Sequence, residues 1–415
     1  MIEFNRFTLD NGIRVIHQED KSISTVVLNT LYNVGARDEK PQQTGFAHLF
    51  EHLMFAGSKN VPSFDEEIEK AGGSNNAFTN NEYTNYHISV PAENVETAFW
   101  LESDRMLTLN INQTSLNVQK GVVIEEFKQR CYSGPFGLLW HHLRDMLYIN
   151  SPYRWPTIGL DFNHISDATL DDVKSFYQQY YSPNNAIISV VGNISLDSCQ
   201  SLCEKWFGDL AAPKSQRNPN NYTVDEKPNY QVKVEEDLSP NPVVFLAWRW
   251  PNSKEEESYP LELFADLLGG SEVSDLYDVL VKKENLCNVA ECFYMKGVDE
   301  GLFVMYGILN PGVEQKTIEN RLLEVALACI DKGEENRFAF ESAQNKAYTQ
   351  QLFESINPTQ RAHKLAFYEL INNPDGVNEE ANKFKSCTLE KTLTVAQKHL
   401  SKESVSVLYY NPKTN

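Results

Sequence analysis

The sequence repeats one strand-to-helix pattern in its two halves, and this repeat limits the folds open to the chain. In the first copy, an apolar, β-branched segment at 24–36 precedes the helical segment GFAHLFEHLMFAG at 45–57. In the second copy, the apolar segment at 242–252 precedes YPLELFADLLGGS, which also ends at glycine. Internal self-similarity of this kind predicts two domains of similar fold.

The segments between these copies predict further strands and helices. Apolar segments at 83–90 and 185–193 have the pattern of strands, whereas 91–107 and 115–132 have the pattern of long helices. Gly121 weakens the second helix slightly. We therefore expect an α+β protein of two similar domains, each a mostly antiparallel sheet with helices packed on one face.

The boundary between the two domains is predicted from composition. Residues 211–230 break all periodicity and are rich in proline, asparagine and charge, as is typical of a linker. This predicts a first domain at 1–215 and a second at 216–415.

Bulk composition excludes several classes of protein. The hydrophobic content of 41% and charged content of 23% are typical of a soluble globular protein. No stretch approaches the roughly 18 consecutive apolar residues of a membrane span, and the N-terminus lacks the pattern of a signal peptide. The seven cysteines match no disulfide or zinc-finger framework, which favours reduced thiols in the cytoplasm. The formal net charge of −20 argues against nucleic acid or an anionic membrane as a partner.

The helical segment at 45–57 carries three residues suited to metal chemistry: His48, Glu51 and His52. Positions i, i+3 and i+4 of a helix share one face, so both imidazoles can bind one ion while the carboxylate lies beside them. Zinc suits imidazole ligands, and a carboxylate next to a reacting water can take up and deliver its proton. The order H-x-x-E-H inverts the better-known H-E-x-x-H helix.

A pattern this short also arises by chance, so its context matters. When Gly57-Ser58 is aligned with Gly270-Ser271, the second copy has only apolar residues at the places of the trio. These residues are Leu261, Phe264 and Ala265. A trio without chemistry would have less reason to be confined to one copy. The alternative is that the histidines are ordinary surface or core residues of an amphipathic helix.

A third ligand is required, and KGVVIEEFKQR offers Glu125 and Glu126. Glu126 shares a helix face with Val122 and Val123 and is expected to point partly inward, whereas Glu125 lies about 100° away around the helix. This favours Glu126. The alternative is that both carboxylates are solvated on an exposed face.

Three segments in order resemble one family of enzymes: GFAHLFEHLMFAGS, then GGSNNAFTNNEYTNYH at 72–87, then QKGVVIEEFKQR at 119–130. They are similar to the zinc peptidases with an inverted motif, such as pitrilysin, insulin-degrading enzyme and the mitochondrial processing peptidase. The resemblance covers most of residues 1–210. It implies that His48, His52 and Glu126 bind one zinc ion per chain and that Glu51 is the general base. The donor set also suits manganese or cobalt.

The resemblance further implies a substrate-binding edge strand and a supporting carboxylate. NAFT at 76–79 matches the family strand that pairs with the substrate backbone, with Asn76 and Ala77 as the contact residues. Glu82 matches a family glutamate near the metal. Asn76 as a turn residue and Glu82 as a surface charge are the alternatives.

The sequence departs from the family at two places. Where members often carry a glutamate seven residues before the third ligand, this chain has Gln119. Active members also bring an arginine and a tyrosine to the substrate from the C-terminal half, where this chain has Val281 and Asn288 within LVKKENLCN. These two side chains would orient the scissile carbonyl and stabilise its oxyanion.

The interpretation that follows is a cytoplasmic zinc endopeptidase subunit that hydrolyses oligopeptides or unfolded segments in a closed chamber. We expect a heterodimer in which a homologous subunit supplies the arginine and tyrosine, with a homodimer as the fallback. The alternative is a peptide-binding or assembly subunit whose metal site is vestigial or structural.

Overall fold

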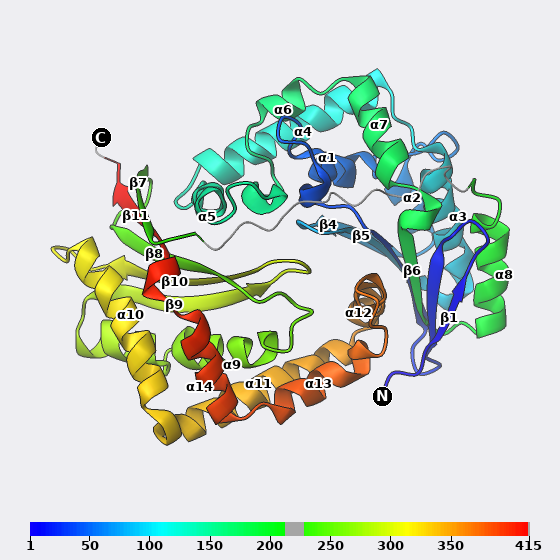
Figure 1. Ribbon diagram of the computed structural model, residues 1–415. Helices are drawn as coiled ribbons and strands as arrows, with labels where there is room; N and C mark the ends of the chain where they lie inside the picture. The colour runs from blue at the N-terminus through cyan, green and yellow to red at the C-terminus, as the bar shows by residue number, and fades with distance from the viewer. Residues whose placement is uncertain (212–227, 414–415) are drawn as a thin grey trace. The chain divides into compact units, whose positions relative to one another are not determined.

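The computed structural model describes residues 1–211 and 228–413 and contains two sheets with the expected α+β architecture (Figure 1). The first is six-stranded in the order β1-β2-β6-β3-β5-β4, with strands Asn5–Thr8, Arg14–Glu19, Ala186–Gly192, Thr25–Tyr32, Thr84–Pro91 and Ser74–Thr79. The second is five-stranded in the order β7-β11-β8-β10-β9, with strands Gln231–Asp237, Ser406–Pro412, Val243–Trp250, Gly301–Leu309 and Cys287–Lys296.

The predicted repeat is visible in the strand topology. Taken in chain order, strands β2, β3, β4, β5 and β6 of the first sheet occupy the same relative places as β7, β8, β9, β10 and β11 of the second. Each sheet is antiparallel except for one pair, β2 with β6 and β7 with β11, which is parallel. The expected mostly antiparallel sheets in two similar halves are therefore confirmed.

The helices also follow the repeat. Helix α1 (Phe46–Leu53) comes between β3 and β4, as α9 (Ser258–Gly269) comes between β8 and β9. The other α-helices are α2 (Phe64–Lys70), α3 (Val95–Thr108), α4 (Gln113–Tyr132), α5 (Leu139–Leu147), α6 (Asn163–Ser166), α7 (Leu170–Tyr180), α8 (Leu196–Phe207), α10 (Gln315–Asp331), α11 (Arg337–Ile356), α12 (Pro358–Leu370), α13 (Gly376–Ser386) and α14 (Leu389–His399).

The main core of the first sheet lies against its helices. Residues Val26, Leu28, Ile88 and Val90 of the strands are fully buried or nearly so, and they share one cluster with apolar residues of α1 and α3. Burial of this kind contributes about 25 cal/mol per Å² of apolar surface. The second sheet has its own core, formed with α9, α10 and α14. Each half therefore has a separate hydrophobic centre.

The chain divides into two compact units, and each unit contains segments from both sides of the predicted boundary at residue 215. One unit comprises Met1–Lys128, Trp155–Tyr222 and Phe353–Asn378, and the other comprises Gln129–Arg154, Thr223–Leu352 and Glu379–Asn415. The predicted linker at 211–230 lies mostly outside the described residues.

Helix α12 explains why a C-terminal segment belongs to the first unit. It contacts β3 and β6, and its residues Ala362, Leu365 and Ala366 are buried against Val27 and Val191 of the sheet. The Ser189 hydroxyl also donates to the Ala362 carbonyl at 2.5 Å. The first sheet is therefore covered on its second face as well.

Candidate metal centre

Helix α1 holds the histidine pair on a rigid base. Phe46, Leu49, Phe50 and Leu53 of this helix are at most 1% exposed, so one face is anchored in the core of the first unit. The opposite positions carry His48 and His52, whose side chains are 8% and 25% exposed. An i, i+4 pair on an anchored helix has little freedom to separate, as the facial argument from the sequence required.

The structure brings His48, His52 and Glu126 together. The two Nε2 atoms are 3.4 Å apart, and the Glu126 Oε2 atom lies 3.5 Å from His48 Nε2 and 3.3 Å from His52 Nε2. Tetrahedral bonds of zinc to imidazole and carboxylate, at roughly 2.0–2.2 Å, place their ligand atoms about 3.3–3.5 Å apart. The three donor atoms therefore have the spacing of ligands to one small divalent cation.

The chemistry of the donor set also fits a cation. A neutral imidazole carries one N–H, so two Nε2 atoms facing each other and one carboxylate oxygen concentrate lone pairs in one place. A divalent ion satisfies all three groups, and the mixed nitrogen and oxygen set suits zinc. Among the described residues, these three form the group of candidate ligands whose donor atoms all lie within 4.8 Å of one another.

Helix α4 separates the two adjacent glutamates. The Glu125 side chain is 74% exposed and binds Lys128 at 2.7 Å, whereas that of Glu126 is 21% exposed and reaches the histidines. Val123 and Phe127 anchor the helix and are at most 2% exposed. The preference for Glu126 agrees with this geometry, although one of its premises was wrong because Val122 is 46% exposed.

The two glutamates provide a matched test of the ligand assignment. We expect Glu126→Gln to lower zinc affinity at least tenfold, because a neutral amide replaces a charged ligand, and Glu125→Gln to leave affinity unchanged. Competition with a chromogenic chelator measures both. Equal affinity of the two variants would remove Glu126 from the metal centre.

The start of α1 is supported by Glu39, which the sequence analysis did not single out. Helix α1 begins after Gly45, which has a φ of 88° and no side chain to cap the helix. Instead, the Glu39 carboxylate accepts the N–H groups of Gly45 at 2.9 Å and Ala47 at 2.8 Å. Burial raises the pKa of Glu39, and these backbone hydrogen bonds act in the opposite direction. The signal in the sequence for this support was a glycine directly before the helix and an acidic residue six positions upstream.

Replacing Glu39 tests whether it holds α1 in place. We expect Glu39→Ala to lower the free energy of unfolding by about 1–3 kcal/mol, because two buried N–H groups lose their acceptor. Glu39→Gln keeps one carbonyl acceptor and should lose less. Denaturant titration of both variants measures the order, and an alanine variant as stable as the wild type would contradict it.

Glu51 occupies the next turn of α1, one residue before His52. It is half-buried and lies near Tyr86 and Tyr181. Burial raises the pKa of both tyrosines, and the negative charge of Glu51 adds to the effect. Both hydroxyls therefore stay protonated at neutral pH and can donate to a neighbouring oxygen.

The remaining predicted site residues lie on three elements of the first unit. Asn76 and Ala77 are on β4, the last strand of the first sheet, which α1 contacts (Figure 1). Glu82 is in the turn between β4 and β5 and is 5% exposed, so it is not the surface charge of the alternative reading. Gln119 is half-buried on α4, two turns before Glu126.

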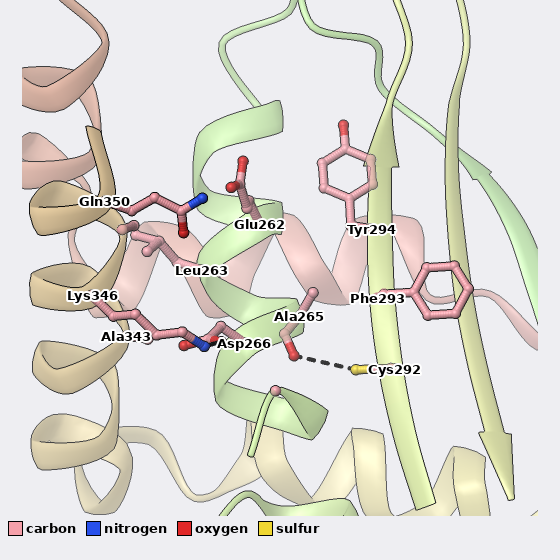
Figure 2. Close-up of a pocket in the computed structure, with 12 residues that line it drawn as sticks. Glu262, Leu263, Ala265, Asp266, Cys292, Phe293, Tyr294, Ala343, Lys346 and Gln350 are labelled. Atoms are coloured by element: carbon pink, nitrogen blue, oxygen red, sulfur yellow. Dashed lines mark hydrogen bonds and ion pairs between the residues drawn. The ribbon is translucent and has the colours of Figure 1, made fainter. Parts of the chain in front are cut away.

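The counterpart of α1 in the second unit has no metal-binding residues at the aligned positions. Leu261 and Phe264 of α9 are fully buried in the second core, and Ala265 lines a pocket of about 200 Å³ between α9, β9 and α11 (Figure 2). The Lys346 ammonium pairs with the Asp266 carboxylate in this pocket. The repeat therefore keeps the scaffold and not the donors.

The two positions where the family has arginine and tyrosine lie just before and within β9. Val281 is in a π-helical segment, Tyr277–Lys283, and packs partly buried against the second core. Asn288 is exposed near the start of β9. Neither side chain carries a positive charge or a phenol.

Comparison with known proteins identifies similar chains. A family model described as insulinase (peptidase family M16) matches residues 14–147, and one described as the peptidase M16 inactive domain matches 167–346. The zinc protease PqqE of Helicobacter pylori is 26% identical over 410 residues, which is 98% of this chain and 92% of that protein. The uncharacterised zinc protease YmxG of Bacillus subtilis is 26% identical over 331 residues, 79% of this chain and 78% of the other.

Solved structures show the same fold. The crystal structure of a protease from Helicobacter pylori has a TM-score of 0.92 and 25% identity, over 99% of this chain and 100% of that one. No helix of the described residues has the length and apolar character to cross a membrane.

Proposed function

Because the chain belongs to the insulinase family of peptidases, family M16, we propose that it is the zinc-binding subunit of an endopeptidase. Its substrates in this proposal are oligopeptides or unfolded segments. The observation that carries the proposal is the spacing of 3.3–3.5 Å between the donor atoms of His48, His52 and Glu126. The zinc-protease names of its relatives support the choice of metal.

In this proposal His48, His52 and Glu126 hold one zinc ion per chain. When bound, zinc acts as a Lewis acid toward the scissile carbonyl and a water molecule. Glu51 takes a proton from the attacking water and later delivers it to the leaving amine. The buried hydroxyls of Tyr86 and Tyr181 keep the surroundings of Glu51 polar without adding charge.

Strand β4 binds the substrate backbone in this proposal. The Asn80 N–H donates to the Tyr83 carbonyl, so the backbone N–H and C=O groups of the even-numbered residues of β4 point toward β5. The backbone groups of Ala77 therefore point to the open edge of the sheet. The Asn76 Oδ1 atom accepts the Ala77 N–H at 2.8 Å. An extended peptide adding to β4 exchanges this local bond for one to its own carbonyl.

The positions of Val281 and Asn288 extend the proposal to a partner. A related subunit supplies the arginine and tyrosine that these side chains cannot replace, and the two chains enclose the substrate in a chamber in the cytoplasm. A pairing of two identical copies is the fallback. If the chain alone cleaves peptides at the full rate of the complex, the partner is unnecessary.

Metal removal tests the function directly. We expect the purified complex to contain one zinc per copy of this chain, to lose cleavage of a fluorogenic peptide library on dialysis against a chelator, and to regain it with zinc. Elemental analysis accompanies each step. A chain that binds zinc but cleaves nothing, alone or with its partner, would favour a binding or assembly subunit instead.

A further inference from the structure

The two sheets differ at one edge. In the first sheet, the outer edge of β2 is covered by β1, which pairs with it antiparallel from Asn5 opposite His17 to Thr8 opposite Arg14. In the second sheet, the counterpart of β2 is β7, and among the described residues it is the terminal strand, paired with β11 alone. Within the part of the chain that the structure describes, β7 thus has no counterpart of β1 beside it.

The backbone of β7 presents hydrogen-bonding groups on that open side. The Gln231 N–H donates to Val405 O at 3.2 Å, and Asp237 O accepts from Lys413 N–H at 2.9 Å, so the odd-numbered residues face β11. The backbone groups of successive residues point to opposite edges of a strand. The N–H and C=O groups of Val232, Val234 and Glu236 therefore point away from β11, to the open edge of the sheet. Val232 and Val234 are 43% and 58% exposed.

The usual protections of an edge strand are weak here. Natural edges are blunted by proline, by an outward lysine, by a bulge or by short length. Strand β7 spans seven residues, QVKVEED, without proline. Its lysine, Lys233, turns toward α5, with Nζ 2.9 Å from His142 Nδ1 and 3.3 Å from Glu235 Oε1. A regular edge without proline, with Val232 and Val234 exposed beside the charged Glu236, can still be a template for another strand.

We propose that β7 pairs antiparallel with the β7 of a second copy of this chain, about a two-fold axis at Val234. A two-fold axis makes the partner strand antiparallel, as β1 is to β2. In this register the outward-facing residues match, with Val234 opposite the partner's Val234 and Val232 opposite the partner's Glu236. The residues between them bring Lys233 opposite the partner's Glu235.

Charge and apolar contact both favour this register. Lys233 and Glu235 form two symmetry-related pairs of opposite charge at positions where side chains of an antiparallel pair are closest. Val234, the more exposed of the two valines, packs on its own copy. The contact lies in the second unit and does not depend on the metal centre or on the related subunit proposed above.

Charge reversal tests the register. We expect sedimentation equilibrium to show a reversible dimer of the wild-type full-length chain. Lys233→Glu alone and Glu235→Lys alone should each raise the dissociation constant at least about tenfold, because both cross-strand pairs become repulsive. An equimolar mixture of the two variants should dimerise again, because each copy then meets the opposite charge.

The mixture also controls for effects within one chain. The Lys233–Glu235 contact inside each variant stays broken in the mixture, so recovery there reports the contact between copies. Val234→Pro is a second variant, which removes an outward N–H while leaving the bonds to β11 in place. The proposal is overturned if the wild-type chain stays monomeric at a concentration of about 100 µM. It is also overturned by a dimer whose dissociation constant none of these variants changes.

Discussion

Replacing Glu51 by glutamine is expected to lower the turnover number for peptide cleavage by about 10²–10⁴-fold while zinc remains bound. The amide has nearly the shape of the carboxylate but cannot accept the proton of the attacking water. Glu51 is one residue from His52 on α1, yet the three grouped donor atoms belong to His48, His52 and Glu126. Loss of activity without loss of metal is the signature of this separation of roles.

The measurement combines elemental analysis with steady-state kinetics on one fluorogenic peptide. Glu125→Gln is the matched control, since Glu125 is an exposed glutamate paired with Lys128 and should keep full activity. If Glu51→Gln loses zinc together with activity, Glu51 belongs to the metal site. If it keeps both, Glu51 has no part in the reaction.

The candidate metal centre was largely predictable because its signal is local. His48, Glu51 and His52 occupy positions i, i+3 and i+4 of α1, and helix geometry alone places them on one face. The choice between Glu125 and Glu126 also followed from helix periodicity. Val122 is exposed, but Val123 and Phe127 form the buried face of α4 and leave Glu126 half-buried.

The parts that were not predictable depend on contacts between distant segments. Nothing in the amphipathic pattern of α12 states which sheet it covers, yet Ala362 and Leu365 are buried against strands more than 150 residues away. This packing gives the first unit a C-terminal segment, which no single boundary near residue 215 describes. Similarly, the support of α1 by Glu39 depends on how the intervening loop folds back.

The second large effect concerns a buried ion pair on α3 that is linked to α1 through Tyr86. Arg105 and Glu102 on α3 have side chains that are 1% and 0% exposed, and the Arg105 Nε atom donates to Glu102 Oε1 at 3.0 Å. The guanidinium lies 4.5 Å from the ring centroid of Tyr86, whose hydroxyl donates to the Phe50 carbonyl of α1. Arg105→Met should lower the free energy of unfolding by about 3–5 kcal/mol, because Glu102 is left buried without its partner.

Two variants distinguish an uncompensated charge from the value of the pair itself. The double variant Glu102→Leu with Arg105→Met removes both charges and should recover most of the lost stability. Lys205→Ala breaks the exposed Lys205–Glu96 pair and should cost at most about 1 kcal/mol. Chemical denaturation followed by circular dichroism compares all three. A double variant as unstable as Arg105→Met would mean that the guanidinium acts mainly through its contact with Tyr86, and zinc affinity should then fall in both variants because Tyr86 supports α1.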